Sequence, residues 1–279
     1  MKAGRESRTA ISVCVGRAMA HGRTPVGRFS DPTALALLPG NVRKRIERLR
    51  SDGVQLTKRE RLGRSVVDKQ AKMVVARTVV IDDTLRSAET PQLVILGAGL
   101  DGRAWRLPEL RDVTVFEVDH PDSQRQKRIR VAALTKVARD VRFVPVDFER
   151  DRLEDALTAA GHDPSRPTTW LWEGVIMYLS RGDIETTLGV VQARSARGSR
   201  MVVLYLGPSL LFRAIGLVGY FFGEVLRSTF SEDQMRALLG KFGFDTTEDL
   251  DSITRDLLDD TSGTPWAAKH LRVVSAVCK

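Results

Sequence analysis

The chain has 279 residues, of which 42% are hydrophobic and 28% are charged. This balance is typical of a globular protein and excludes a fibrous or largely disordered chain. The length suffices for one large α/β domain with additional elements. Two cysteines occur, Cys14 and Cys278 near opposite ends, and no Cys-x-x-Cys pattern is present. These features argue against a disulfide framework or a metal site, and they favour a reducing, cytoplasmic location.

The net charge of +9 is concentrated in the N-terminal part of the chain. Residues 1–64 hold 15 Lys and Arg against 5 Asp and Glu, whereas the remaining residues hold 29 against 30. A basic segment of this kind can bind nucleic acid or an anionic substrate, or it can be the solvated face of a helix. We favour the solvated face, because Phe29 is the sole aromatic residue before Trp105 and a single-strand binder would lack stacking groups.

Two segments of this N-terminal part are predicted to be helical. The first is Arg43–Arg50, which is rich in arginine. The second, Thr57–Arg86, carries apolar residues at helical spacing. The sequence therefore predicts a helical extension over residues 1–86, followed by an α/β domain over residues 87–279.

A short apolar run and three glycines open the predicted α/β domain. Leu93–Leu96 is typical of a strand that is buried on both faces of a parallel sheet. The glycines that follow it satisfy the pattern G-x-G-x-x-G and are Gly97, Gly99 and Gly102. Such glycines let the backbone approach a nucleotide at a helix N-terminus. Asp119, at the end of the next β-branched run, could then accept hydrogen bonds from ribose hydroxyls.

Acidic residues follow four successive predicted strands. The strands are expected at residues 93–96, 113–118, 141–146 and 168–172, and the acids at or just after their ends are Asp101, Asp119, Asp147 and Glu173. Ligands of open parallel sheets bind outside the carboxyl ends of the strands, so these carboxylates should converge on one crevice. They would repel a pyrophosphate, but they suit S-adenosylmethionine, which offers an ammonium, a sulfonium and hydroxyls without any phosphate. The alternatives are that some acids only cap helices, or that the chain is an NAD-dependent oxidoreductase.

The stretches LGAGLDGRAWRL, VFEVDHP, VPVDF and WEGVIMYL occur in this order between residues 96 and 179. They resemble the successive motifs of the leucine carboxyl methyltransferase family, a group of class I S-adenosylmethionine-dependent methyltransferases. The resemblance implies an α/β fold, with a Rossmann-like seven-stranded sheet and helices on both faces. It also implies S-adenosylmethionine as cofactor and S-adenosylhomocysteine as product.

The resemblance implies a set of cofactor-binding residues as well. The matching positions are Arg77, Gly97, Gly99, Asp101, Arg103, Asp119, Asp147, Phe148 and Glu173. Arg77 would hold the carboxylate of the cofactor's methionine part through a two-pronged hydrogen bond. Asp147 would accept the adenine amine, Phe148 would cover the ring, and Glu173 would contact the amino end. Tyr178 would face the acceptor as the catalytic residue, and Arg23 is a weaker candidate for a cofactor contact.

Other interpretations of these residues stay open. Arg77 could form a surface pair with Asp82 or Asp83, and Arg103 could form a structural ion pair with an acid at a strand end. Tyr178 could be a core tyrosine. At Gly102 the chain departs from the family, which usually has a threonine there; the loss of the hydroxyl should loosen the helix start by up to about 1 kcal/mol.

The later part of the chain contains a long apolar segment. Residues 207–227 follow a predicted strand at Arg200–Leu206, but Arg213 and several glycines argue against a membrane span. We expect an insertion at about 207–230 that forms an apolar lid over the acceptor, with core packing or membrane-surface contact as alternatives. Its candidate pocket walls are Phe212, Tyr220, Phe221 and Phe222. Further elements are expected at Gln124–Arg139, Arg181–Arg194 and Phe230–Phe242 as helices and at Phe244–Leu250 and Leu271–Cys278 as strands.

These features predict an O-methyltransferase that acts on the carboxylate, or alternatively the hydroxyl, of a small, largely apolar molecule such as a polyketide or fatty acid. A carboxylate is ionised at neutral pH and needs no catalytic base. His120 is therefore set aside, although a phenol or alcohol acceptor would require a base. We expect a monomer or homodimer without a transmembrane segment. A nucleic-acid-binding or nucleic-acid-modifying protein is the alternative from another functional class.

Overall fold

The core of the fold is a seven-stranded sheet with the strand order β3-β2-β1-β4-β5-β7-β6. All neighbouring pairs are parallel except those of β7, which runs antiparallel to both β5 and β6. The computed structural model describes residues 7–24, 26–51, 53–147, 150–209, 226–249 and 270–279. The strands are β1 Gln92–Leu96, β2 Thr114–Asp119, β3 Asp140–Pro145, β4 Thr168–Trp172, β5 Arg200–Leu206, β6 Phe244–Asp249 and β7 Leu271–Cys278. This architecture confirms the predicted fold class.

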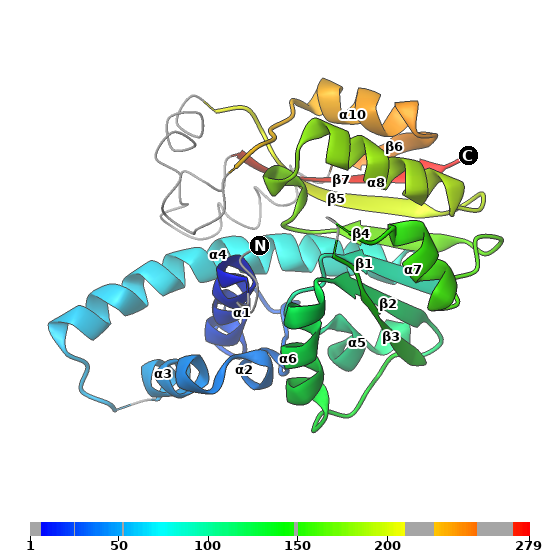
Figure 1. The fold of residues 1–279 in the computed structure, drawn as a ribbon. Coiled ribbons are helices and arrows are strands. Elements are labelled where there is room, and N and C mark those ends of the chain that lie inside the picture. The colour runs from blue at the N-terminus through cyan, green and yellow to red at the C-terminus, as the bar shows by residue number, and fades with distance from the viewer. Residues whose placement is uncertain (1–6, 25, 52, 148–149, 210–225, 250–269) are drawn as a thin grey trace.

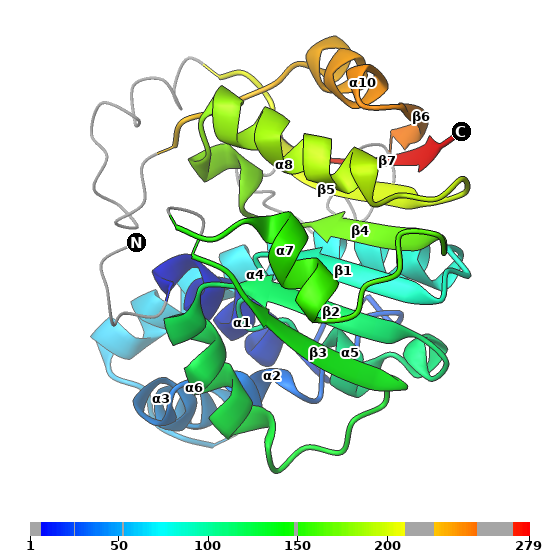
Figure 2. The same cartoon turned by 45° about the vertical axis from the view of Figure 1, so that its right-hand side comes forward.

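Helices cover both faces of the sheet, with α7 and α8 in front of it and α4 behind it in the view of Figure 2. Each face has its own apolar cluster, because alternate residues of the buried strands point to opposite sides: Leu93 and Ile95 to one cluster, Val94 and Leu96 to the other. The helices are α1 Arg8–Ala20, α2 Ala34–Leu37, α3 Gly40–Arg50, α4 Lys58–Arg86, α5 Arg103–Arg106, α6 Pro121–Val131, α7 Leu153–Ala159, α8 Arg181–Ala193 and α10 Glu232–Lys241, with short 3-10 turns η1 at Pro108–Leu110 and η2 at Ile176–Tyr178. No helix in the described ranges is long and apolar enough to cross a membrane.

The helix predicted at Gln124–Arg139 is shorter than expected, because α6 ends at Val131. The chain leaves the helix to pair with the region around α5. The amides of Val137 and Ala138 donate to the carbonyl of Ala104 at 3.0 and 2.9 Å. The sequence does not reveal this contact, because Ala104 and Val137 lie more than thirty residues apart along the chain. The other predicted helices and strands lie within a few residues of their expected positions.

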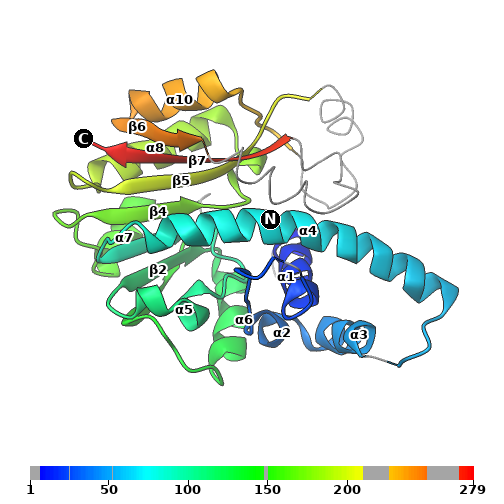
Figure 3. The ribbon, with the colours of Figure 1, turned by 180° about the vertical axis from the view of Figure 1, so that it is seen from behind.

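The long helix α4 has two unlike halves (Figures 1 and 3). A capping box at Thr57 and Glu60 starts it, and its buried residues all lie from Ala71 onward. The second half packs across the sheet, whereas the first half projects beyond it toward α3. Helix α1 crosses α4 closely: a Cβ on Gly16 would lie only 3.0 Å from a methyl of Val74. The second half of α4 and α1 thus frame the carboxyl end of β1.

Candidate functional site

The glycine turn connects β1 to α5 and adopts a backbone conformation that favours glycine. Gly97 has φ of 72° and Gly99 has φ of 46°, both in the left-handed region. A Cβ on Gly97 would also lie 2.3 Å from a methyl carbon of Val175, so a side chain there has no room. The amides of Gly97 and Ala98 donate to the carbonyl of Val118 at 2.8 and 2.9 Å, which ties the turn to β2. The turn is therefore a fixed backbone cradle at the carboxyl edge of the sheet.

Asp119 lies next to this turn, as its position at the end of β2 predicts. One of its carboxylate oxygens accepts a hydrogen bond from the amide of Gly99, and the other accepts from the amide of His120 at 2.6 Å. Burial raises the pKa of Asp119, although these backbone amides favour its ionised form. The structure thus brings Gly97, Gly99 and Asp119 together, and contact of Asp119 with ribose hydroxyls stays a prediction.

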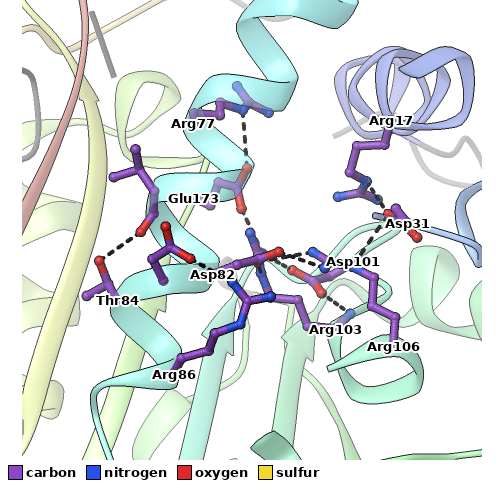
Figure 4. A network of polar contacts seen from close by, with 12 residues as sticks. Arg17, Asp31, Arg77, Asp82, Thr84, Arg86, Asp101, Arg103, Arg106 and Glu173 are labelled. Atoms are coloured by element: carbon purple, nitrogen blue, oxygen red, sulfur yellow. Dashed lines mark hydrogen bonds and ion pairs between the residues drawn. The ribbon is translucent and has the colours of Figure 1, made fainter. Parts of the chain in front are cut away.

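Arg103 is the centre of a buried ionic network beside the turn (Figure 4). Its Nε lies 2.7 Å from Asp82 Oδ1, and its Nη1 lies 2.9 Å from Glu173 Oε2 and also binds the carboxylate of Asp101. The Arg103 side chain is fully buried. Burial opposes ionisation of Asp101, but the Arg103 guanidinium holds the pKa of that carboxyl well below its usual range. Of the two open interpretations, the structure shows the ion pair, and a contact between Arg103 and the cofactor stays a prediction.

Arg77 approaches the same network from the buried half of α4. Its Nε lies 3.2 Å from Glu173 Oε1, and both side chains are only 10% exposed. The alternative of a surface pair does not hold, since Asp82 binds Arg103 and Arg106 and Asp83 binds other arginines. Burial alone would raise the pKa of Glu173, but the Arg103 and Arg77 guanidiniums together lower it. Glu173 is therefore held as a carboxylate between two arginines.

For the remaining predicted site residues, the structure shows fewer side-chain contacts. Tyr178 ends η2, a short turn that follows Glu173, and its amide donates to the carbonyl of Val175 at 2.9 Å. Asp147 follows β3, and its Oδ2 lies 3.8 Å from Nε of Arg150. Phe148 and the predicted pocket walls Phe212, Tyr220, Phe221 and Phe222 lie outside the described residues. Roles for all of these residues stay predictions.

Arg23, the weaker N-terminal candidate, contacts α3. Its Nη2 donates to the backbone carbonyl of Arg50, at the end of α3. His120, which the sequence analysis set aside as a base, caps α6 by accepting a hydrogen bond from the amide of Asp122 at 3.2 Å. Neither contact points to a direct role in catalysis.

Several buried charges beside the turn were not singled out by the sequence analysis. Glu117 and Lys127 form an ion pair of 2.6 Å in which neither side chain is more than 1% exposed. Burial raises the pKa of Glu117 to about 7, while Lys127 opposes the shift. A charged residue within the apolar strand TVFEVD is the signal that could have revealed this pair, because isolated charges are rarely buried. Arg17, Asp31 and Arg106 extend the network toward α1. In the described part of the chain, no group of three or more His, Cys, Asp or Glu side chains could hold a metal ion.

The comparisons with known proteins agree with this geometry. A model of the leucine carboxyl methyltransferase family matches residues 10–192, so the similarity begins well before the motifs of the glycine turn. A candidate S-adenosyl-L-methionine-dependent methyltransferase of Frankia alni is 38% identical over 200 residues, which cover 69% of this chain and 66% of that protein. A second one, from Mycobacterium sp., is 34% identical over 69% of this chain and 64% of its own length. The matched part of the chain thus spans no more than about two thirds of these relatives.

Solved structures show the same fold at low sequence identity. A candidate methyltransferase of Thermobifida fusca superposes with a TM-score of 0.57 at 14% identity, covering 100% of this chain and 97% of that one. A DUF574 family protein of Streptomyces avermitilis superposes with a TM-score of 0.53 at 13% identity, covering 82% and 94% of the two chains. With a family model that matches more than half of its residues, the chain belongs to the leucine carboxyl methyltransferase family.

Proposed function

We propose that the protein is an O-methyltransferase that transfers the methyl group of S-adenosylmethionine to the carboxylate of a small, largely apolar molecule such as a polyketide or fatty acid. In this reaction an acceptor oxygen forms a bond to the methyl carbon while the bond between that carbon and the sulfonium sulfur breaks. The sulfonium becomes the thioether of S-adenosylhomocysteine, and no proton has to move. Alignment of the two reactants and removal of water from the carboxylate would supply the catalysis.

The state of Glu173 is the observation that best supports a carboxylate acceptor. A phenol or alcohol would need a general base near the methyl group. Glu173 is a poor base, because two arginines bind it and lower its pKa. His120 caps α6 through its Nδ1 and is engaged there. An acceptor that arrives already ionised requires neither residue, and a hydroxyl acceptor is therefore the weaker proposal.

The residues around the turn support this proposal in defined roles. Gly97 and Gly99 would let the backbone approach the cofactor, and Asp119 would accept hydrogen bonds from its ribose. Arg77 would bind the cofactor's carboxylate, and Tyr178 would orient the acceptor through its hydroxyl.

Calorimetric titration of the purified protein with S-adenosylmethionine, S-adenosylhomocysteine and NADH tests the cofactor. We expect micromolar binding of the two adenosyl compounds, and at least about tenfold weaker binding in Asp119→Ala, because a charge-assisted hydrogen bond contributes about 1.5–3 kcal/mol. Asp122→Ala is the matched control, since Asp122 lies in the first turn of α6 just beyond Asp119. Binding of NADH alone would contradict the proposal.

Transfer of a labelled methyl group tests the acceptor. We expect methyl esters from medium-chain and long-chain fatty acids, at a rate that changes little between about pH 6.5 and 8.5 because the acceptor is ionised throughout. A preference for phenols, with a rate that rises over this range, would instead assign a base-dependent hydroxyl acceptor.

A further inference from the structure

Helix α1 packs directly on the glycine turn through one face. Ala10, Cys14 and Arg17 lie on this face, since their spacing of four and three residues places them one above another. A Cβ on Gly99 would lie 3.0 Å from the Cβ of Ala10, so the helix and the turn are in van der Waals contact. Cys14 Sγ lies 3.2 Å from the carbonyl oxygen of Ala34 and connects the same face to α2. Helix α1, with α2 beside it, thus covers one side of the glycine turn.

Arg17 makes a polar contact between α1 and the glycine turn. Its Nη2 donates to the backbone carbonyl of Leu100, which lies between Gly99 and Asp101. Its Nε lies 3.0 Å from Asp31 Oδ2, and neither side chain is more than 5% exposed (Figure 4). The guanidinium therefore joins a carbonyl of the turn to a carboxylate of the segment that connects α1 and α2. A buried charge of this kind is retained at a cost in desolvation, which its two partners offset.

A second contact joins the connecting segment to the end of the turn. The Thr33 hydroxyl donates to Asp31 Oδ1 at 2.6 Å, and this fixes the position of the Thr33 oxygen. A Cβ on Gly102 would lie only 2.1 Å from that oxygen. Gly102 has an ordinary φ of −110°, so the close approach of Thr33, and not backbone strain, requires glycine here. The family usually has a threonine at this position of the turn. Here the hydroxyl of Thr33, from the N-terminal segment, occupies the space that a side chain at position 102 would take.

We propose that Arg17 is a positioning residue of the cofactor site, which holds the Leu100 carbonyl and the Asp31 carboxylate so that the backbone at 99–102 keeps the conformation that receives S-adenosylmethionine. Arg17 acts through the turn, and it is assigned no contact with the cofactor itself. The inference rests on the cofactor site proposed above and adds the N-terminal helices to that site. Affinity for the cofactor should therefore depend on Arg17, which lies 83 positions before Leu100 along the chain.

The test compares S-adenosylhomocysteine binding with thermal stability in the full-length chain. Arg17→Met alone leaves Asp31 buried with less compensation and lowers the stability of the protein, so the informative variant is Arg17→Met/Asp31→Asn, which removes both charges. We expect its melting temperature to exceed that of Arg17→Met, while its affinity for S-adenosylhomocysteine stays at least about tenfold below wild type, as expected for a misplaced turn. Arg17→Lys should give an intermediate affinity, because one ammonium cannot reproduce the two-partner fork.

Arg28→Ala is the matched control. Arg28 also links the N-terminal segment to α4, through an ion pair of 2.7 Å with Asp83, but its side chain is 58% exposed. We expect wild-type affinity in this variant. If wild type binds S-adenosylhomocysteine and Arg17→Met/Asp31→Asn binds it equally well, the positioning role is overturned. If wild type itself does not bind, the proposed function fails instead.

A steric exchange tests the second contact independently. Gly102→Ala should weaken S-adenosylhomocysteine binding, because its methyl group collides with the Thr33 oxygen. Adding Thr33→Ala removes that oxygen, and affinity should then recover by most of the loss. Recovery would support a turn whose shape the N-terminal segment sets. Loss of affinity that persists in Gly102→Ala/Thr33→Ala would show that Thr33 does not set the shape of the turn.

Discussion

Two regions of the molecule use the same pairs of arginine and carboxylate in opposite environments. Around the glycine turn, Arg103 is fully buried against Asp82 and its neighbours. In α3 and the projecting half of α4, Arg48 lies 3.0 Å from Glu60, yet the arginine side chain is 56% exposed. Desolvation makes the first kind of pair costly to break, whereas water and salt screen the second. The density of charged residues along the sequence therefore does not show which ion pairs contribute to the stability of the fold.

The projecting region also contains a groove of about 730 Å³ along the first half of α4. Its lining includes Arg61, Arg64 and Lys69, and the nearby pair of Arg64 with Asp68 is 3.7 Å long and half exposed. None of the predicted cofactor residues lines this groove. The basic residues of α3 and of the first half of α4 thus lie mainly at solvent-facing positions, while the arginines beside the turn are fixed by several partners each.

Removal of Arg103 should have the largest effect on stability. Arg103→Met leaves the carboxylates of Asp101, Asp82 and Glu173 buried with too little positive charge, and we expect a loss of about 3–5 kcal/mol in the free energy of unfolding. Urea denaturation measures this loss. Arg103→Lys keeps the charge without the fork and should lose less. A loss below about 1 kcal/mol in Arg103→Met would mean that the buried region behaves like the exposed one.

Acidification should narrow the difference in melting temperature between the wild-type protein and Arg103→Met. In the wild-type protein the pKa values of Asp101 and Glu173 lie below their ordinary values of 3.8 and 4.5. The two carboxylates therefore stabilise the folded state fully above these ordinary values, and this stabilisation is lost as the pH falls through the lowered pKa values. In the variant, burial without Arg103 raises both pKa values, so protonation relieves the buried charge. Melting temperatures at about pH 7 and pH 3.5 measure the gap. A gap that widens in acid would contradict this account.

The smallest effect is expected in the exposed region. Arg48→Ala removes an ion pair to Glu60 that water screens, and the expected loss is below about 1 kcal/mol at low salt. Added salt should reduce the loss further. The Thr57 and Glu60 capping box remains intact in this variant, so the start of α4 should persist. A loss as large as that of Arg103→Met would remove the distinction between the two regions.

The sequence alone determined the strands, the glycine turn and the acids that gather around it. Apolar runs of four to seven residues fix where the buried strands lie, because each such strand must hide both faces. Parallel strands place their carboxyl ends at one edge, so Asp101, Asp119 and Glu173 could be brought together without knowledge of any side-chain contact. Gly97 could be assigned in the same way, since a tight turn after a strand calls for glycine.

Only the tertiary structure decided which charges pair and where α6 ends. Arg103 had an acid from each of several elements within reach, and the choice of Asp82, Asp101 and Glu173 depends on how α4 packs on the sheet. The same holds for Arg17, whose partner Leu100 is 83 residues away along the chain. Local patterns report the period of a helix or strand, because that period depends on neighbouring residues. A long-range contact depends on the packing of whole elements, so no local pattern contains it.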